Sequence, residues 1–509
     1  MKTYIKVFAA TMALAFFAVS CSDFLDDVPV NGTLTPDSFY NTDEDANSAV
    51  LAAYDMLTWN NNLWGWCAPV LIKTLPSDES SGGGASPGDQ PDYDAIDKYS
   101  YDSGNSKIEG MWSLAYYGIY RSNLVVDNVA GDTDRKKQHI AEALALRAYN
   151  YLDIAAFYGG GPLLTTTNIS PAEYDQPRVG ADALYQQIET DLTAAIPDLP
   201  VKSAYSDSDK FRISKGTAQS LLGKARLYNK DYAGALSAFQ EVINSGEYAL
   251  DPDFSNVFRK GGELGSGSIF EAVFSDDVGH NWGTNPWDLG QSERAWESNM
   301  HIQLMGPREG EFGNTESGLI EGWGFNYPSV KLADMYDAAG DEVRKNATIM
   351  SGDDYNAAGG AVTGNAYDYN GFVRLKYGTY PDESDAETSI QQNYGTNWRL
   401  IRYADVLLMA AEAAAFSGDE ATARQYINMV RSRAGLGETS ASGGDLVTML
   451  QNERMLELAF EGFRYIDLIR WDAAEAVLGS EGFTSKNNLF PVPANEILKA
   501  PSMDQNPGW

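Results

Sequence analysis

The sequence has little of what disulfide-rich, zinc-binding and nucleic-acid-binding proteins depend on. It contains 2 cysteines and 3 histidines among 509 residues, which excludes a disulfide framework and a zinc site with the usual Cys/His spacing. Only 37 Lys and Arg residues stand against 71 Asp and Glu residues, so that the formal net charge is −34. A field of that sign repels phosphate backbones and anionic lipid headgroups. The charge therefore excludes nucleic-acid binding and basic adhesion to a membrane surface.

Beyond its first 20 residues the chain also lacks long apolar runs. Even the stretch Val406–Phe416 is interrupted by Glu412, whereas a membrane-spanning helix needs ~20 apolar residues in succession. The composition, 43% hydrophobic and 21% charged, is that of an ordinary globular protein. A chain of this length buries enough surface to need no disulfides or metals, and it allows about three domains or one large unit built from repeats.

The first 20 residues have the pattern of a secretory signal peptide. Two lysines precede an apolar run from Val7 to Val19, which is too short to cross a bilayer and fits the apolar region of such a signal. The run leads to Ala18-Val19-Ser20-Cys21, which resembles a bacterial lipobox, the motif whose cysteine is lipidated. We therefore expect cleavage after Ser20 and a lipid anchor, such as palmitate, on Cys21, with residues 21–509 as one mature domain. The acidic residues after Cys21 are similar to the segment that marks surface-exposed lipoproteins.

Helical periodicity predicts a mainly α fold. Its clearest instance is a pair of helices near residues 214–245 that are separated by a very short turn. Gly223 and Ala235 are small where these helices should cross, and Phe239 should fill the groove between them, as in a tetratricopeptide repeat. We expect helices over Asp43–Leu57, Met111–Val129, Lys137–Tyr158, Ala181–Ile196, Ser214–Asn229 and Asp231–Asn244, and a second pair near residues 403–433, over Tyr403–Phe416 and Glu420–Arg433.

Two stretches differ in composition from the helices, residues 59–105 and 250–395. Glycine, asparagine and aromatic residues are more frequent in them, and helical periodicity fades. Within them we expect a flexible loop at Ser80–Gly84 and short strands near Ser268–Phe274 and Gly371–Tyr377. Loops this long are uncommon in compact domains unless they carry function. The sequence thus predicts a scaffold of helical pairs with two large, irregular excursions.

Charged residues near the C-terminus alternate in sign at helical spacing. This pattern is typical of ion pairs between packed helices, and we expect it to stabilise the fold without taking part in chemistry. The residues concerned are Glu453, Arg454, Glu457, Glu461, Arg464, Asp467 and Arg470.

The sequence contains no complete catalytic or metal-binding motif. Residues 84–88 match the nucleophile-elbow pattern, but that motif needs a strand before it and we expect a loop there. The histidines have neither recognisable triad partners nor ligand spacing. Residues 43–47 begin like a calcium loop but lack its glycine and its final glutamate, so we interpret them as the start of a helix. We expect no catalytic residue, metal or cofactor, although a glycoside hydrolase needs only two carboxylates in one cleft and the sequence leaves that alternative open.

Ordered motifs connect the chain to a known family over its whole mature length. It has CSDFLD at residues 21–26, AEALALRAY at 141–149, RYADVLLM at 402–409, ELAFEG at 457–462 and QNPGW at 505–509. Together these motifs resemble the SusD/RagB family of outer-membrane nutrient-binding lipoproteins. The resemblance implies an α-helical fold with tetratricopeptide-like pairs and a lipid-anchored position on the extracellular side of the outer membrane. It also implies a partnership with a SusC-like TonB-dependent transporter, to which the protein delivers glycan without catalysis.

Seven of the 11 tryptophans fall in two short windows inside the excursions, residues 59–66 and 282–323. Their neighbours are Asn, Gly and Asp, and no period places these rings on a core face. Sugar rings stack on indole, and SusD-like proteins bind glycans through aromatic platforms in corresponding loops. We expect glycan contacts from Trp64, Trp66, Trp282, Trp287, Trp296 and Trp323, with Asp78 as a polar contact, and we expect Trp112, Trp398 and Trp471 to lie in the core.

The ligand itself has alternatives. Clustered aromatic residues favour a glycan, whereas a peptide or another nutrient on the same scaffold stays open. The negative net charge favours a neutral polysaccharide or oligosaccharide over a sulfated or uronate-rich one.

Overall fold

The computed structural model describes residues 39–59, 68–276, 298–313, 318–363, 365–384 and 393–509. The expected signal peptide and Cys21 lie outside these ranges. The helices are α3 (Asp43–Tyr54), α4 (Met56–Trp59), α5 (Pro69–Thr74), α6 (Pro91–Asp97), α7 (Ser106–Asn128), α8 (Asp134–Tyr158), α9 (Ala181–Ala195), α10 (Lys215–Tyr228), α11 (Tyr232–Asn244), α12 (Met300–Met305), α13 (Val330–Ala339), α14 (Glu342–Thr348), α15 (Gly352–Ala357), α16 (Tyr403–Phe416), α17 (Glu420–Arg433), α18 (Gly443–Leu458), α19 (Arg464–Arg470), α20 (Ala474–Leu478) and α21 (Ala494–Lys499). The strands are β1 (Ser80–Gly83), β2 (Gly160–Gly161), β3 (Val179–Gly180), β4 (Ser268–Ala272), β5 (Phe325–Pro328), β6 (Ile349–Ser351), β7 (Phe372–Arg374) and β8 (Trp398–Arg402).

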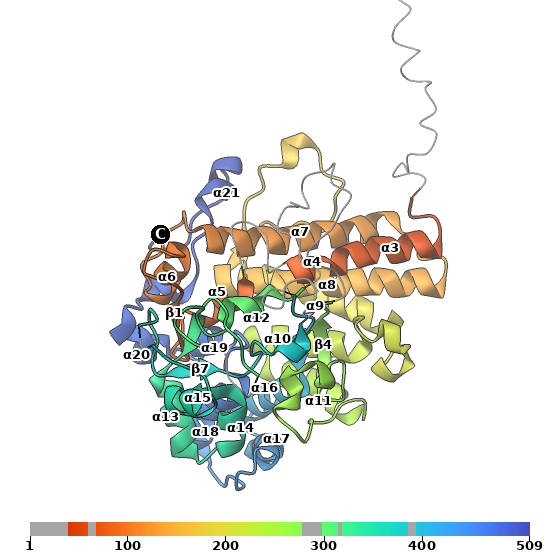
Figure 1. The fold of residues 1–509 in the computed structure, drawn as a ribbon. Coiled ribbons are helices and arrows are strands. Elements are labelled where there is room, and N and C mark those ends of the chain that lie inside the picture. Colours follow the sequence, from red (N-terminus) through yellow and green to blue (C-terminus); the bar gives the residue numbers. More distant parts are fainter. Residues whose placement is uncertain (1–38, 60–67, 277–297, 314–317, 364, 385–392) are drawn as a thin grey trace, which may run out of the picture.

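The helices form one scaffold in which neighbours along the sequence are also neighbours in space. Helices α7, α8, α9, α10, α11, α16 and α17 pack against one another in that order, and α3 packs against α7 and α8. Figure 1 shows α3, α7 and α8 side by side across one part of the molecule, with α11, α16 and α17 at another. In the described ranges the strands form only two-stranded antiparallel pairs, β1–β5, β2–β3, β4–β8 and β6–β7. The mainly α fold with helical pairs is therefore confirmed.

The crossing of α10 and α11 has the predicted packing. Gly223 faces the ring of Phe239 so closely that a Cβ atom on Gly223 would lie 2.5 Å from a ring carbon. Ala235 and Phe239 are both fully buried. A larger residue at position 223 would push the helices apart, and this explains why a glycine occupies the interior of a helix, where it costs about 0.5–1 kcal/mol relative to alanine.

The starts of the helices also follow the sequence pattern. The side chain of Thr42 accepts a hydrogen bond from the backbone of Asp45, whose carboxylate in turn accepts from the backbone of Thr42. This capping box begins α3, so the acidic residues at 43–47 are a helix N-terminus, as predicted. The second helical pair, α16 and α17, has the predicted bounds, and Asp419 caps α17 by accepting from the backbone of Thr422.

Two expectations for the excursions were wrong. Residues 80–83 form strand β1, paired with β5, and are not a flexible loop. The glycines that suggested flexibility allow close approach, since a Cβ atom on Gly83 would lie 2.1 Å from the carbonyl oxygen of Gly324. Residues 330–357 contain three helices, α13, α14 and α15. The first two are capped by the side chains of Ser329 and Asp341.

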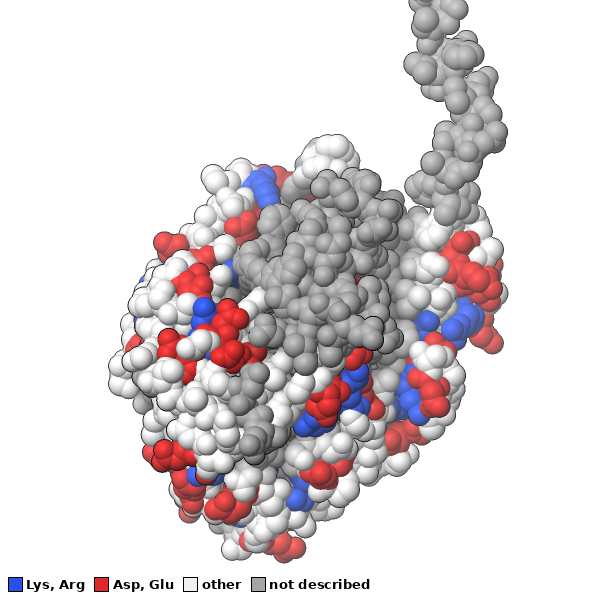
Figure 2. Space-filling model, in the orientation of Figure 1, with Lys and Arg blue, Asp and Glu red and all other residues white. Residues whose placement is uncertain are grey.

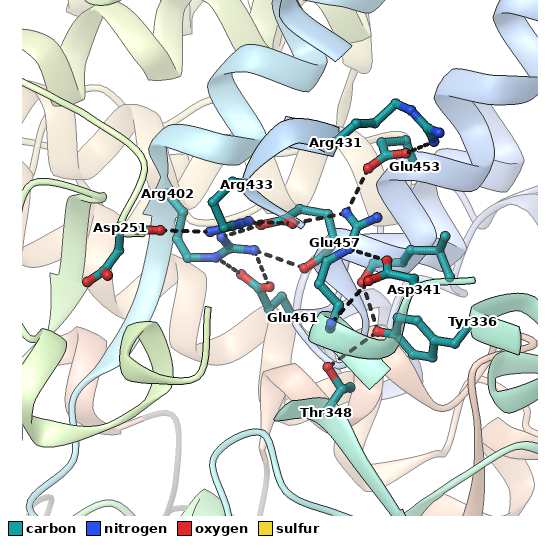
Figure 3. Close-up of polar contacts among 12 residues, drawn as sticks. Asp251, Tyr336, Asp341, Thr348, Arg402, Arg431, Arg433, Glu453, Glu457 and Glu461 are labelled. Carbon is teal, nitrogen blue, oxygen red and sulfur yellow. Dashed lines mark hydrogen bonds and ion pairs between the residues drawn. The ribbon is translucent and has the colours of Figure 1, made fainter. Parts of the chain in front are cut away.

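The alternating charges near the C-terminus form a buried ion-pair network, as predicted (Figure 3). Glu457 lies at its centre, with oxygens 2.6 Å from Arg433, 2.8 Å from Arg402 and 3.2 Å from Arg344. Glu461 lies 2.6 Å from Arg402. The side chains of Glu457, Arg402 and Arg344 are at most 3% exposed. The network thus joins β8, α14, α17 and α18.

A second set of buried ion pairs continues this network toward α16. Arg454 lies 2.9 Å from Asp405 and 2.6 Å from Asp467. Arg470 contacts both Asp467 and Glu412. Paired in this way, the charges hold α16, α18 and α19 together and are not available for catalysis.

Candidate functional site

The described flanks of the two tryptophan windows meet at one inner pocket. Leu57 lies in α4, next to the first window, Phe274 precedes the second window, and His301 lies in the described part of that window. All three line a pocket of about 80 Å³, together with Trp398 of β8. Segments that are far apart in the sequence therefore border the same space, which is the arrangement that a single site formed by both windows requires.

Buried amides hold these flanks in position. The side-chain N–H of Asn393 donates to the carbonyl oxygen of Asp276 at 2.7 Å, and that of Asn299 donates to the carbonyl oxygen of Thr396 at 2.7 Å. Asn299 and Asn393 are fully buried. The amides satisfy backbone carbonyl groups that would otherwise be costly to bury, and these hydrogen bonds hold the flanking segments together. Sequence analysis did not single them out, although the high asparagine content of residues 250–395 indicated them.

Trp323 is the one predicted tryptophan contact that lies within the described residues. Its backbone N–H donates to the carbonyl oxygen of Gln303 in α12 at 2.9 Å. Helix α12 lies inside the second window, next to the described flank at residues 298–299. The side chain is half-buried and packs against the main core. Trp323 therefore lies within one six-residue helix, a length of about 9 Å, of that flank. The other five predicted tryptophans, Trp64, Trp66, Trp282, Trp287 and Trp296, lie outside the described residues.

Asp78, the predicted polar contact, is held in an ion-pair cluster. Its carboxylate is 0% exposed and lies 2.7 Å from Arg464 and 2.6 Å from Lys331. Although burial opposes ionisation, these two cations hold the pKa of Asp78 below its usual range. This placement favours a structural role for Asp78, joining the start of β1 to α13 and α19, over direct contact with a ligand.

The neighbouring carboxyl, Glu79, makes the stability of the protein depend on pH. Burial, with the charge of Asp78 adding to it, raises the pKa of Glu79 to about 8. Because the folded-state pKa lies above the ordinary value of 4.5, the contribution of Glu79 to stability is greatest below pH 4.5 and is lost as the pH rises toward 8. The variant Glu79→Gln cannot ionise and should lack this loss. Its free energy of unfolding should therefore rise relative to that of the parent between pH 5 and pH 8, by up to a few kcal/mol.

Urea unfolding of both proteins at several pH values measures this difference. Near pH 3, well below the ordinary value of 4.5, Glu79 is almost entirely neutral in both states, so the comparison there isolates the effect of exchanging the two side chains. A difference between variant and parent that stayed constant from pH 5 to pH 8 would contradict the assignment.

The walls of the inner pocket provide hydrogen bonding and packing. Burial, reinforced by the positive charge of Arg374, lowers the pKa of His301 to about 3, so the imidazole is neutral near pH 7. On another wall Lys73 and Asp153 form an ion pair at 2.6 Å. With so low a pKa, His301 is a weak base near neutral pH and is poorly suited to general acid–base catalysis.

The nucleophile-elbow match at residues 84–88 has a strand before it, β1, and a helix after it, α6, contrary to our expectation. Ser86 is nevertheless exposed, and no His, Asp or Glu in the described ranges hydrogen-bonds to its hydroxyl group. The strand–turn–helix context alone does not activate a serine.

Two further properties concern the described ranges only. No three His, Cys, Asp or Glu side chains within them are grouped so that they could hold a metal ion. None of the helices there has both the length and the apolarity needed to cross a membrane. Figure 2 shows Asp and Glu side chains spread over the described part of one face, with fewer Lys and Arg side chains.

The tryptophans predicted to lie in the core have two different environments. Trp112 and Trp398 are 2% and 5% exposed, as predicted. Trp471 is half-buried and lies outside the hydrophobic core clusters, so this expectation was wrong. The reason is its position at the C-terminal end of α19, where its indole N–H donates to Glu412 at 3.0 Å and keeps the ring near the surface.

Two protein-family models match ranges of the chain that include most of the described helices. A model described as "SusD family" matches residues 268–487, and a model described as "Starch-binding associating with outer membrane" matches residues 85–228. Among curated proteins, SusD-like protein P2 of Formosa agariphila is 26% identical over 540 residues, covering 98% of each chain. SusD-like protein P25 of the same organism is 27% identical and covers 96% of this chain and 95% of its own.

Solved structures are similar over nearly the same length. A laminarin-binding SusD-like protein has 29% identity and a TM-score of 0.81, with 92% of this chain and 99% of that chain covered. Surface glycan-binding protein A from Bacteroides thetaiotaomicron, in complex with laminarihexaose, has 26% identity and a TM-score of 0.78, with 92% and 100% covered.

Proposed function

We infer that the chain belongs to the SusD family, and on this premise we propose that it is a cell-surface protein that binds a neutral polysaccharide or oligosaccharide without cleaving it. The observation that carries the proposal is the similarity along almost the whole chain to a laminarin-binding SusD-like protein, with a TM-score of 0.81. The meeting of both tryptophan windows' flanks at one pocket supports a single ligand site.

The chemistry of the site favours a neutral sugar. Indole rings offer flat apolar surfaces for the C–H faces of sugar rings. The net charge of −34 opposes sulfated or uronate-rich chains. The neutral His301 and the paired carboxylates beside the site support binding without catalysis.

Replacing Trp323 tests the site where the structure describes it. If Trp323 stacks on a sugar ring, Trp323→Ala should weaken binding of laminarihexaose by about 1–3 kcal/mol, the range measured for stacking on aromatic side chains. Trp64→Ala, Trp66→Ala, Trp282→Ala, Trp287→Ala and Trp296→Ala should each have an effect of that size if their rings take part. Isothermal titration calorimetry measures the affinity, and the melting temperature reports whether the fold is intact.

Two further variants control this experiment. Trp323→Phe keeps most of the packing against the core and should lose less affinity than Trp323→Ala. Tyr174→Ala removes a 63% exposed aromatic ring outside both windows and should bind like the parent. If all six tryptophan variants bound as well as the parent did, the ligand site would lie elsewhere.

We also propose that the mature protein is anchored through Cys21, faces the extracellular side of the outer membrane and delivers its glycan to a SusC-like TonB-dependent transporter. The lipobox-like sequence and the family description "associating with outer membrane" support this. Extraction of outer membranes in mild detergent should recover the parent together with a transporter, whereas Cys21→Ala should leave the membrane fraction. Retention of Cys21→Ala on membranes after a salt wash would place the anchor elsewhere, and repeated isolation of the parent alone would count against the partnership.

A further inference from the structure

A groove on the helical scaffold has no role in the site described above. One part, of about 270 Å³, lies between the turn after α10, the end of α16 and the end of α19. A wider and more open part, of about 1450 Å³, runs along α9. Tyr228 and Lys230 line both parts, so the groove is continuous. The two parts together are long enough and open enough to suit an extended chain better than one small molecule.

The narrow part of the groove is separate from the inner pocket, although the two spaces share one wall. Its 270 Å³ part includes Phe416, the last residue of α16, whereas the first residue of α16 follows β8 at the inner pocket. A 14-residue helix is about 21 Å long. The ring of Tyr228 also lines the inner pocket and forms a wall that both spaces share.

Aromatic rings line the narrow end of the groove. Tyr232 and Phe416 stack with their centroids 5.0 Å apart and their planes at 22°. Phe416 is 42% exposed, so a large apolar ring faces solvent beside the pocket. Trp471 lies in the same lining. Aromatic rings held side by side with exposed faces are suited to stacking on flat apolar surfaces of a ligand.

Trp471 is fixed in position by buried charges. Its indole N–H donates to Glu412 at 3.0 Å, and the guanidinium group of Arg470 lies 4.8 Å from its ring centroid. Glu412 is 1% exposed and pairs with Arg470. The ring is therefore held rigidly at the surface without being part of the core, so little entropy would be lost when a ligand packs against it.

Neutral polar side chains line the wide part of the groove, beside the charged residues Asp182, Glu189 and Lys230. Gln186, Thr190 and Thr193 project from one face of α9 at helical spacing and are all exposed. At the narrow end, Gln451 and Asp472 line the pocket, and the described residues give their side chains no hydrogen-bond partner. Amide, hydroxyl and carboxylate groups of this kind match the hydroxyls of a sugar chain.

We propose that this groove is a second carbohydrate-binding site, which holds an extended, neutral glycan chain with one or two sugar units against the rings of Tyr232, Phe416 and Trp471. The ligand class rests on the proposed function, but the site is separate from the tryptophan windows. A chain that stacks at its end and is hydrogen-bonded along α9 uses both parts of the groove.

The test measures how many laminarihexaose molecules bind per chain, and variants in the groove show where the second molecule binds. Native mass spectrometry of the parent should detect two oligosaccharides per chain at saturation. Phe416→Ala should weaken the second binding event about tenfold, as expected for the loss of one stacking ring. Thr190→Arg, which places a long side chain in the groove from an exposed helix position, should abolish that event. Tyr120→Ala, at a 53% exposed ring on α7, is the matched control and should bind two.

Each other outcome overturns the proposal. One ligand per chain in the parent, with Phe416→Ala and Thr190→Arg binding as the parent does, would leave the proposed function intact and remove the second site. Unchanged oligosaccharide binding together with loss of a co-purifying protein in Thr190→Arg would make the groove a protein-docking surface. If no oligosaccharide bound at either site, the proposed function would fail as well.

Discussion

Replacing Glu457 by Gln should destabilise the protein by about 3–5 kcal/mol, the cost typical of removing one partner from a buried ion-pair network. The carboxylate is 0% exposed and contacts Arg433, Arg402 and Arg344. Burial by itself would raise the pKa of Glu457, but these three cations hold it well below its usual range. Without the carboxylate, three arginines lose a shared counter-charge while they stay buried.

The ionisation of Glu457 also makes the free energy of unfolding depend on pH. A depressed folded-state pKa gives stability that is present above the ordinary value of 4.5 and is lost as the pH falls below it. The difference between Glu457→Gln and the parent should therefore shrink as the pH falls below 4.5. Urea unfolding at pH 7 measures the loss of stability in Glu457→Gln, and urea unfolding at pH 3 measures how far that loss shrinks.

Glu420→Gln is the matched control, since Glu420 pairs with Arg424 at the surface, where the two side chains are 38% and 30% exposed. It should change the free energy of unfolding by less than about 0.5 kcal/mol. A Glu457→Gln variant no less stable than Glu420→Gln would show that the network does not hold the scaffold together.

Replacing Phe239 by Ala should cost about 3–5 kcal/mol, because it empties the space between α10 and α11. Phe239 is fully buried and fits against Gly223, where a Cβ atom would lie 2.5 Å from the ring. The fit predicts coupling between the two positions. Gly223→Ala should destabilise the parent, whereas in the Phe239→Ala background the same change should be neutral or stabilising, because alanine favours a helix over glycine by about 1 kcal/mol.

Thermal or urea unfolding of the two single variants and the double variant completes this cycle. Leu498→Ala, at a 77% exposed position, should be close to the parent and controls for the loss of apolar atoms. If Gly223→Ala had the same effect in both backgrounds, the contact between residue 223 and the ring would not determine how the helices cross.

The scaffold could be predicted from the sequence because local patterns determine it. The small residues Gly223 and Ala235, with Phe239 at the proper spacing, specify a crossing of two helices without reference to the rest of the chain. The alternating charges from Glu453 to Arg470 likewise indicate buried pairing, although their partners Arg344 and Arg402 come from distant segments and could not be identified.

The candidate site was predictable only in part, because distant segments form it. Leu57, Phe274 and His301 line one pocket because segments that are distant in the sequence pack together. Periodicity within one segment does not predict such packing. The positions of Asp78 and Trp471 also depend on partners from distant segments. Asp78 pairs with Lys331 and Trp471 donates to Glu412, and neither partner could be identified from the local sequence.

Calorimetric titration of the purified protein with laminarihexaose and maltohexaose, beside a sulfated oligosaccharide of similar length, tests the central claim most directly. The account predicts saturable binding of a neutral glucan, weakened by Trp323→Ala, no binding of the sulfated chain, and no release of new reducing ends during the titration. Binding of the sulfated chain alone, or steady release of reducing ends from a neutral glucan, would contradict it.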